Sequence, residues 1–526
     1  MKQRILISLI LILVGSGLSG QEVFRRFSTD LENYPGELAT FMGTSDEETQ
    51  PLIIKTFIEN WNAGMMLDTT KAQLIAISNK MLDKNARPRP HFITYLQVIN
   101  AFTIYHGPAE NYLNWLRSMH HFTASRDYTL PVINDYLLFS LKLLNSGILY
   151  ESNSTRWTSS NADFQLLFND SVQVVVGATD LICSAVRDSI LVYGTSGIYN
   201  PLNHYWRGAG GRITWERAGY SPDQVYATLD EYMINFRFYE FHADSVTFYH
   251  KKYFDFEILG SLDDKVERII SQATANYPRF GSYQASFNID DIFEVIDYYG
   301  GISMYGSKMI GTGIGDKKAI LNFFRNDTLV IVARSEIFVF DPAIITSNEA
   351  EISLYVDDDS IYHPSIGMNY IVDENRFLSR RTSNFQSHSP YYNSFHRVDM
   401  NFEQLSWQLD DNLIQLKMRE GGASGLANFQ SENLFDAYTY FRLQGIDDEN
   451  PLVLLRRYSE HVFDISFYGT EFARFAHMRP THAQQLLKQL AQLGFLTYDL
   501  EGDRVTMRQK SYDWIYASVD YIDYDV

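Results

Sequence analysis

Residues 165–176 read Gln165-Leu-Leu-Phe-Asn-Asp-Ser-Val-Gln-Val-Val-Val176, two short apolar runs separated by Asn169-Asp170. Asn and Asp accept a left-handed backbone and bond to their own backbone, so this pair predicts a tight turn between two β-strands. Before Trp157 the apolar residues recur with helical spacing, and after it they recur in short runs typical of strands. The change of period predicts an α+β chain with a helical N-terminal part and a β-rich middle.

The helical part extends from about Leu31 to Leu149, and its predicted helices carry apolar stripes interrupted at Gly or Pro. These helices are expected at residues 51–64, 74–82, 92–105, 112–122 and 131–144. Because the breaks between them are short, we expect either stacked α-hairpins or an irregular helical bundle. No fixed repeat signature is present, which makes a tetratricopeptide-like solenoid the weaker alternative.

Short apolar runs alternate with turn residues up to about residue 418. An acidic residue followed by Ser or Thr and an aliphatic residue precedes five of these runs, at Asp170, Asp188, Asp244, Asp327 and Asp359. Each Asp can close a turn by bonding to the backbone two residues on, after which a strand begins. The spacing is uneven, so a β-solenoid and stacked or sandwiched antiparallel sheets remain alternatives.

Alternate residues of such strands must face inward. In residues 232–249 the even-numbered class Tyr232, Ile234, Phe236 and Phe238 is the more apolar, and we expect it to face the core. A closed core would stabilise the fold, whereas a lining left partly open would bind acyl chains. We expect the closed form, because burying each Phe stabilises by about 1.5–3 kcal/mol.

Beyond Gly421-Gly422 the pattern returns to helix, at residues 432–440 and 452–458. A compact unit follows at residues 469–510, where Thr481 and Gln484 form a predicted capping box for a central helix. Its apolar face comprises Ala483, Leu486, Leu487, Leu490 and Leu493. Gly494 ends this helix, and a hairpin across residues 501–503 completes a winged-helix-like order.

The first residues resemble a secretory signal, with Lys2 and Arg4 before an apolar run at 5–14 and small residues at 15–20. The run is shorter than the roughly 20 residues needed to span a membrane. We therefore expect cleavage near Gln21 and a periplasmic or extracellular protein. The single cysteine, Cys183, excludes an internal disulfide and lies too far from the N-terminus for a lipoprotein anchor.

The predicted organisation is thus a signal peptide, a helical domain, a β-rich domain, a helical connector and a winged-helix-like unit. Their boundaries are 1–20, 21–155, 156–420, 421–468 and 469–526.

The chain carries a formal charge of −20, from 64 acidic and 44 basic residues, which disfavours nucleic acid or an anionic membrane as the main partner. A winged helix often binds DNA, so its outward face needs separate consideration. That face carries His482, Gln485, Lys488, Gln489 and Gln492. Only Lys488 among them can neutralise a phosphate, so a packing or protein-contact role is predicted.

The sequence contains no zinc helix, nucleophile elbow or Cys–His pair, and it predicts no cofactor, no metal and no identifiable catalytic residue. His120-His121 cannot serve one helix face together, and the acidic runs 357–359 and 447–450 have the composition of solvated turns. His363 is predicted to close a strand. The glycines of residues 311–315 precede a strand rather than a helix, which favours a β-turn over a phosphate loop.

Three segments, residues 210–216, 243–253 and 359–364, carry a resemblance to a known group of proteins. In them the chain is similar to large exported envelope proteins of Bacteroidetes-type bacteria, which have no assigned activity. The resemblance implies a helical N-terminus followed by β-rich repeats. It also implies that relatives continue beyond a unit like 469–510, so this chain could be a shortened form. The Ala-Asp-Ser-Val segment at Ala243 also resembles the rungs of periplasmic lipopolysaccharide-transport bridge proteins.

The leading hypothesis is a non-enzymatic cell-envelope scaffold or binding protein whose partners are other envelope proteins. The alternatives are a secreted glycan-processing enzyme and a periplasmic lipid- or lipopolysaccharide-binding bridge component. Paired glycosidase carboxylates remain open, because their spacing exists only in three dimensions. A row of exposed Tyr or Trp beside two converging carboxylates would favour the enzyme, and aromatic residues turned inward would favour the scaffold.

Overall fold

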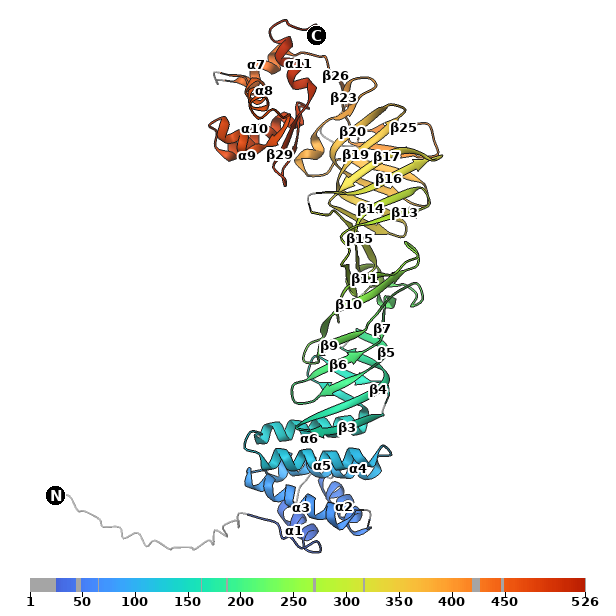
Figure 1. The fold of residues 1–526 in the computed structure, drawn as a ribbon, viewed down its shortest axis with the longest axis vertical. Helices are drawn as coiled ribbons and strands as arrows, with labels where there is room; N and C mark the ends of the chain where they lie inside the picture. Colours follow the sequence, from blue (N-terminus) through green and yellow to red (C-terminus); the bar gives the residue numbers. More distant parts are fainter. Residues whose placement is uncertain are drawn as a thin grey trace, which may run out of the picture. The chain divides into compact units, whose positions relative to one another are not determined.

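The computed structural model describes residues 25–43, 49–64, 66–161, 163–185, 188–267, 271–315, 317–418, 426–445 and 449–525. The predicted signal peptide and Gly421-Gly422 lie outside these residues. The chain divides into two compact units. The first comprises Met1–Ala185, Val192–Ala209 and Met233–Tyr239, and the second comprises Val186–Leu191, Gly210–Tyr232 and Glu240–Val526. The prediction of an α+β chain with a helical N-terminal part and a β-rich middle is confirmed (Figure 1).

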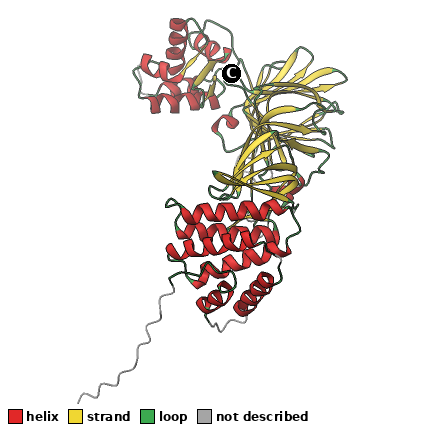
Figure 2. Ribbon diagram, turned by 60° about the horizontal axis from the view of Figure 1, so that its bottom comes forward, coloured by secondary structure: helices red, strands yellow, loops and turns green. Residues whose placement is uncertain are grey.

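The first unit opens with helices, which Figure 2 shows as neighbouring rows. They are α1 (Tyr34–Met42), α2 (Thr49–Asn62), α3 (Asp68–Asp83), η1 (Pro88–Phe92), α4 (Ile93–Ile104), α5 (Ala109–Ala124) and α6 (Leu130–Ser146). The five helices predicted from apolar spacing correspond to α2–α6. Pro and Gly act as the pattern predicts: α6 has a Pro in its first turn, and Gly147 ends it in the left-handed conformation.

The helices pack around buried aromatic rings. Tyr34 and Trp61 lie 5.1 Å apart between ring centroids, and Tyr95 stacks on Trp115 at 6.0 Å. Helix α5 also covers a strand edge, to which its asparagines Asn111 and Asn114, one turn apart, donate hydrogen bonds. Asn111 accepts from the Leu166 amide at 2.8 Å and donates to the Phe164 carbonyl at 2.9 Å. These bonds satisfy backbone groups that an uncovered edge would leave unpaired.

Strands begin at Ile148, inside the segment predicted to be helical. Those of the first unit are β1 (Ile148–Glu151), β2 (Arg156–Ser159), β3 (Phe164–Asn169), β4 (Ser171–Ser184) and β6 (Tyr205–Ala209), together with β5 (Ser189–Asn200) from Val192 on and β9 (Glu231–Asn235) from Met233 on. The predicted hairpin at residues 165–176 is confirmed, since β3 pairs with β4 across Asp170, whose φ is 57°.

The predicted inward class is confirmed for three of its four members. Tyr232, Ile234 and Phe236 are buried, and the Phe236 ring stacks on Trp157 with centroids 4.6 Å apart. The prediction is wrong for Phe238, which is 53% exposed. The chain turns after Asn235, so Phe238 lies beyond the strand and the alternation no longer applies to it.

The second unit contains most of the strands. Its first part comprises β7 (Arg212–Thr214), β8 (Val225–Thr228), β10 (Glu240–His250), β11 (Ile258–Lys265) and β12 (Arg279–Ser282). It continues with β13 (Phe287–Phe293), β14 (Ile296–Tyr305), β15 (Lys308–Thr312), β16 (Ala319–Arg325), β17 (Thr328–Ser335), β18 (Ile337–Asp341), β19 (Ile344–Val356) and β20 (Asp359–Ile371). The last strands of this region are β21 (Arg376–Arg380), β22 (Tyr391–Asn393), β23 (Val398–Asn401), β24 (Gln404–Gln408), β25 (Ile414–Lys417) and β26 (Asn428–Ser431). Short turns η2 (Glu216–Ala218), η3 (Gln272–Thr274) and η4 (Phe385–His388) interrupt them.

Two of the long strands, β14 and β19, change neighbours along their length. Strand β14 pairs with β13 and β16 through its first half and with β12 and β15 through its second. The change occurs at Gly300-Gly301, where a Cβ on Gly301 would lie 2.6 Å from Thr312 Oγ1. Strand β19 passes in the same way from β18 to β17, with a register shift between Ser347 and Ala350. Each of these strands therefore has more than two pairing partners within one continuous sheet, and the irregularity in β19 is of the kind that bends a strand.

The Asp-Ser/Thr-aliphatic elements have two different structures. Asp170 and Asp327 occupy left-handed turn positions directly before strands β4 and β17, as predicted, and Asp188 and Asp359 also lie at strand starts. The prediction is wrong for Asp244, which lies inside β10, where the register shifts between Ala243 and Val246. There the following residue, Ser245, has a φ of 57°, so the element produces a bulge instead of a turn.

The C-terminal part of the second unit has its own core and a three-stranded sheet in the order β27-β29-β28. Its elements are α7 (Ala437–Gln444), α8 (Pro451–Val462), β27 (Ser466–Tyr468), α9 (Gly469–Phe475), α10 (Pro480–Gln492), β28 (Leu496–Asp499), β29 (Arg504–Met507) and α11 (Gln509–Ala517). Ala483, Leu487 and Leu490 are buried as predicted, and Gly494 follows the end of α10 with a φ of 80°.

Two helix starts in this part were predicted incorrectly. The capping box at Thr481 is wrong, because α10 begins at Pro480 with Arg479 as N-cap and no side-chain cap bond. Proline is favoured in the first helical turn, and the N-cap lies two residues upstream of the predicted Thr481. Helix α7 begins only at Ala437, capped by Asp436, so residues 432–436 are not helical. Across the described residues, no helix has both the length and the apolar character needed to cross a membrane.

Candidate functional site

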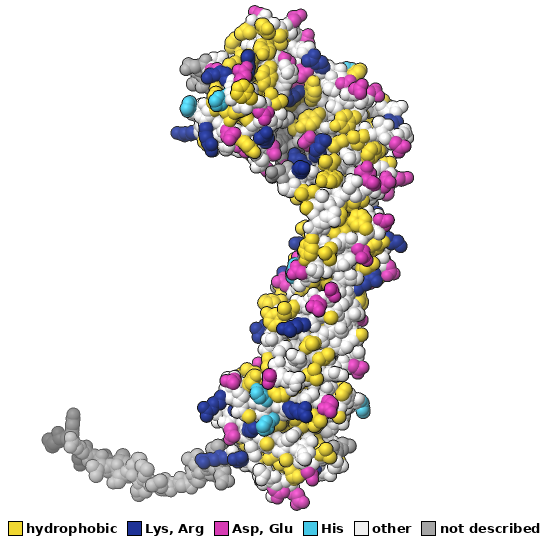
Figure 3. All heavy atoms as spheres, viewed as in Figure 1, with side chains coloured by type: hydrophobic (Ala, Val, Ile, Leu, Met, Phe, Trp, Pro, Cys, Tyr) yellow, Lys and Arg dark blue, Asp and Glu magenta, His cyan; other side chains and the backbone are white. Residues whose placement is uncertain are grey.

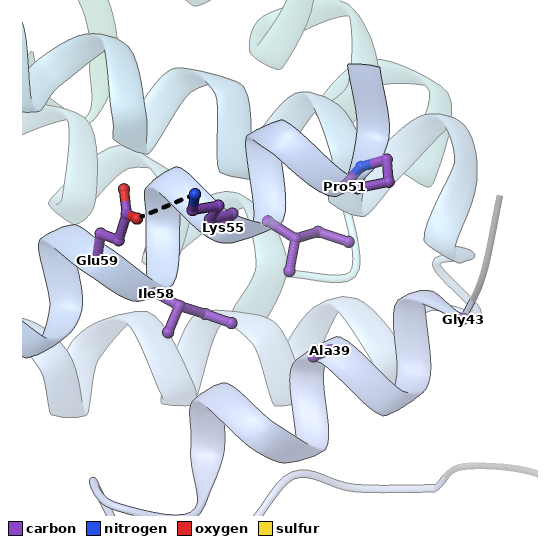
Figure 4. A pocket seen from close by; sticks show the side chains of 7 residues that line it. Ala39, Gly43, Pro51, Lys55, Ile58 and Glu59 are labelled. Carbon is purple, nitrogen blue, oxygen red and sulfur yellow. Dashed lines mark ion pairs between the residues drawn. The ribbon is translucent and has the colours of Figure 1, made fainter. Parts of the chain in front are cut away.

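A groove opens between α1 and α2 in the first unit, with a volume of about 460 Å³ (Figure 4). Its lining consists of Ala39 and Gly43 on the α1 side and Pro51, Ile54, Lys55, Ile58 and Glu59 on α2. The small side chains of the α1 side leave the space, and the two isoleucines, one turn apart, give the opposite wall its apolar character. This volume lies in the range of about 300–1,000 Å³ that is usual for small-molecule sites.

The rim of the groove carries one ion pair. Lys55 Nζ lies 3.7 Å from Glu59 Oε1, and the two side chains are 70% and 63% exposed. Pairs of this kind, one helical turn apart in water, stabilise by only about 0.3–0.5 kcal/mol. Both charged groups can therefore change partners at small cost.

The second unit contains a buried cluster with one base and two acids. Arg217 donates to Asp188 Oδ2 at 2.8 Å and also bonds Asp264. The aspartate side chains are only 4% and 2% exposed. Burial raises the pKa of Asp264 to about 6, against the opposing effect of Arg217. Asp188 also accepts from the Glu267 amide, so the cluster joins three segments of the chain.

A second buried cluster has one acid and two bases. Asp399 on β23 accepts from Lys510 Nζ at 2.7 Å and from Arg508 Nη2 at 2.9 Å. Burial lowers the pKa of Lys510, while Asp399 acts in the opposite direction. Lys510 also donates to the Leu493 carbonyl and Arg508 to the Gly494 carbonyl. The cluster thereby fastens the end of α10 and the start of α11 to the sheet.

His250 is buried without a counter-charge. Its two ring nitrogens make no hydrogen bond within the described part of the chain, and its ring lies 4.4 Å from that of Tyr253. Burial lowers the pKa of His250 to about 4, so the ring is neutral at physiological pH. The surrounding rings of Tyr220, Phe248 and Phe254 exclude water from it.

The three histidines singled out in the sequence, His120, His121 and His363, contact other groups of the chain itself. His120 Nε2 lies 2.8 Å from Lys80 Nζ, whereas His121 packs on Tyr128 and Phe168, so the adjacent rings diverge as predicted. His363 closes no strand: it lies inside β20 and is fully buried. Its Nε2 lies 3.0 Å from the Ser389 carbonyl, and its Nδ1 accepts from the Ser365 amide.

The acidic run at 357–359 meets a turn, as predicted, whereas the run at 447–450 is only partly within the described residues. Asp357 and Asp358 form the exposed turn between β19 and β20, and Asp359 accepts from Ser394 at 2.8 Å. Glu449 pairs with Arg457, Asn450 caps α8, and residues 447–448 lie outside the described residues. The glycine run begins in β15 and turns back before β16. Cys183 is buried within β4.

The outward face of α10 contacts the sheet region through its one base. Lys488 Nζ lies 5.0 Å from the centre of the Phe385 ring on η4, and Gln386 bonds the Tyr498 carbonyl. The residue that could have contacted a phosphate is therefore directed toward the chain itself. On the face drawn in Figure 3, acidic and basic side chains are interspersed over the surface.

Within the described residues, no group of three or more His, Cys, Asp or Glu side chains is arranged to hold a metal ion. The structure also reveals groups that the sequence did not single out, namely the α1–α2 groove, both ion clusters and His250. Local sequence patterns give no signal for groups that meet only in the fold. Asp399 and Lys510, for example, are 111 residues apart in the chain. Comparison of the chain with protein-family models, curated proteins and solved structures finds no match.

Proposed function

We propose that this chain is a non-enzymatic protein of the cell envelope, exported by its N-terminal segment, whose β-rich part acts as a scaffold or binding surface for other envelope proteins. One observation carries this proposal: each of the seven tryptophans is at most 5% exposed. Indole rings buried in this way stabilise a core and are not available to stack on sugars. This placement favours a scaffold over an enzyme that holds sugars on tryptophan, and the criterion of inward aromatic rings is met for Trp but not for exposed tyrosines such as Tyr283, Tyr438 and Tyr521.

The arrangement of the buried carboxylates gives the same preference. Glycosidase carboxylates flank an open site, about 5–10 Å apart, with a substrate between them. Asp188 and Asp264 converge instead on the Arg217 guanidinium, which occupies the space between them. The raised pKa of Asp264 therefore has a structural cause, its burial, and needs no catalytic role.

In this proposal the β-rich part consists of stacked layers of antiparallel strands, and strands with several partners, such as β14 and β19, pass from one layer to the next. The unit at 469–510 is a winged-helix-like module that packs on the sheet and does not bind DNA. Its support is the contact of Lys488 with Phe385, since electrostatic binding to DNA requires several free phosphate-neutralising groups. Submicromolar, salt-dependent binding of duplex DNA by the purified chain would contradict this assignment.

Export is tested by cell fractionation with mass spectrometry of the mature N-terminus. The proposal predicts a periplasmic or extracellular protein that begins near Gln21. Cytoplasmic protein with an intact Met1 would contradict it. The enzyme alternative is tested by incubating the purified chain with envelope polysaccharides. Release of reducing ends that is lost in Asp264→Asn would favour that alternative.

A further inference from the structure

We propose that the groove between α1 and α2 binds a single-chain amphiphile with a zwitterionic headgroup. This inference goes beyond the proposed scaffold function, because the groove lies in the helical part and involves no residue of the β-rich part.

The lining of the groove matches an aliphatic chain. Ile54 and Ile58 form one wall and Ala39 the facing one, and the lining backbone of α1 and α2 is already hydrogen-bonded within these helices. An aliphatic chain needs no hydrogen-bond partner, so such walls can bury it without leaving polar groups unpaired. A sugar or a nucleotide would find polar partners only at the rim.

The size of the groove favours a small amphiphile over a protein. Seven residues line it, around a volume of about 460 Å³. A stable protein interface uses about 20–30 residues on each side. The groove is much smaller than such an interface, and its volume is that of a small-molecule site.

The rim determines the headgroup. The Lys55 ammonium can bind a phosphate, and the Glu59 carboxylate beside it can bind an ammonium group. A phosphoethanolamine head carries both partners. A purely anionic head, such as a fatty-acid carboxylate, would gain Lys55 but face repulsion from Glu59. Because the Lys55–Glu59 pair is exposed and weak, the headgroup can replace it at little cost.

Calorimetry with 1-palmitoyl-lysophosphatidylethanolamine tests the proposal. The lipid is kept below the concentration at which it forms micelles. We expect saturable binding at one site. Ala39→Phe fills the groove and should weaken binding at least tenfold. Thr40→Phe is the matched control, because Thr40 is exposed on the same helix and does not line the groove. Ile54→Gln, which makes the wall polar, provides a second variant should Ala39→Phe fail to fold.

The headgroup assignment has its own test with palmitate as a second probe. Glu59→Gln should weaken lysophosphatidylethanolamine binding several-fold and strengthen palmitate binding, whereas Lys55→Gln should weaken both. The proposal is overturned if Ala39→Phe, in its folded form, binds the lysolipid like the unmodified chain. It is also overturned if neither monomeric probe binds, or if binding is seen only with phosphatidylethanolamine vesicles, which would indicate a surface interaction.

Discussion

The two ion clusters of the second unit have opposite compositions. Around Arg217 one guanidinium meets two carboxylates, and around Asp399 one carboxylate meets two cations. In each cluster, burial disfavours the charge that is in surplus. The pKa of Asp264 is raised to about 6, and the pKa of Lys510 is lowered. The acidic cluster can therefore lose its surplus charge by taking up a proton in mild acid, whereas acid cannot relieve the basic cluster.

The comparison indicates what buried charges contribute to this fold. Ion pairs of this kind are expensive to desolvate, so they add little net stability over apolar residues, but breaking one leaves an uncompensated charge. Each cluster joins segments that are far apart in sequence, such as Asp399 and Arg508, 109 residues apart. We infer that the clusters determine which segments meet, while the apolar core supplies most of the stability.

The largest effect is expected for Asp399→Ala. It leaves Lys510 and Arg508 beside each other without their carboxylate partner, which should cost about 3–5 kcal/mol of unfolding free energy. Urea denaturation measures this loss. The control is Asp399→Leu combined with Lys510→Met, which removes both buried charges of the closest pair and should recover much of the stability. A double variant as unstable as Asp399→Ala would contradict the charge argument.

Arg217→Met should cause the next largest loss of unfolding free energy, about 3 kcal/mol near pH 7.5, because two buried carboxylates then face each other. The loss should shrink at pH 5. Without the guanidinium the pKa of Asp264 rises further from about 6, and protonation removes one of the two charges. Denaturation at both pH values tests this. A loss that is equal at the two pH values would mean that the acidic cluster does not respond to protons.

His250→Phe shows what a buried ionisable group does without any counter-charge. The pKa of His250 is about 4 in the folded chain and 6.5 ordinarily, so the unfolded chain binds more protons between these values. Stability from this group is therefore complete above pH 6.5 and falls as the pH drops toward 4, by up to about 3 kcal/mol. Phe removes this dependence. The stability gain of His250→Phe over the unmodified chain should grow from pH 7.5 to pH 4.5, and a constant difference would contradict the assignment.

Local patterns were sufficient to predict much of the fold. The helices α2–α6 follow from apolar spacing interrupted by Gly and Pro, and the β3–β4 hairpin follows from Asn169-Asp170. These signals act between residues that are close in sequence, so one chain displays them fully. Phe238 and Asp244 show where local patterns fail. A turn before Phe238 and a bulge at Asp244 end the alternation of the strand, and the residue types alone do not predict either.

The groove and the buried clusters could not be predicted, because each depends on pairings across the fold. Asp188, Arg217 and Asp264 are ordinary charged residues in the sequence, and only the strand arrangement brings them together. Lys488 was correctly singled out as the one base on its helix face. Its contact with Phe385 nevertheless required the docking of α10 on η4, which no local pattern encodes.

The central claim is that the core of the β-rich part is closed and structural. Phe236→Ala tests it most directly, because this ring is fully buried against Trp157 and Tyr199. We predict a loss of about 3–5 kcal/mol, seen as a melting temperature lower by on the order of 10 °C. Phe238→Ala, at the exposed end of the same segment, should leave the melting temperature nearly unchanged. An unchanged melting temperature for Phe236→Ala, together with lost binding of acyl chains, would contradict the claim and favour a lipid-transport bridge.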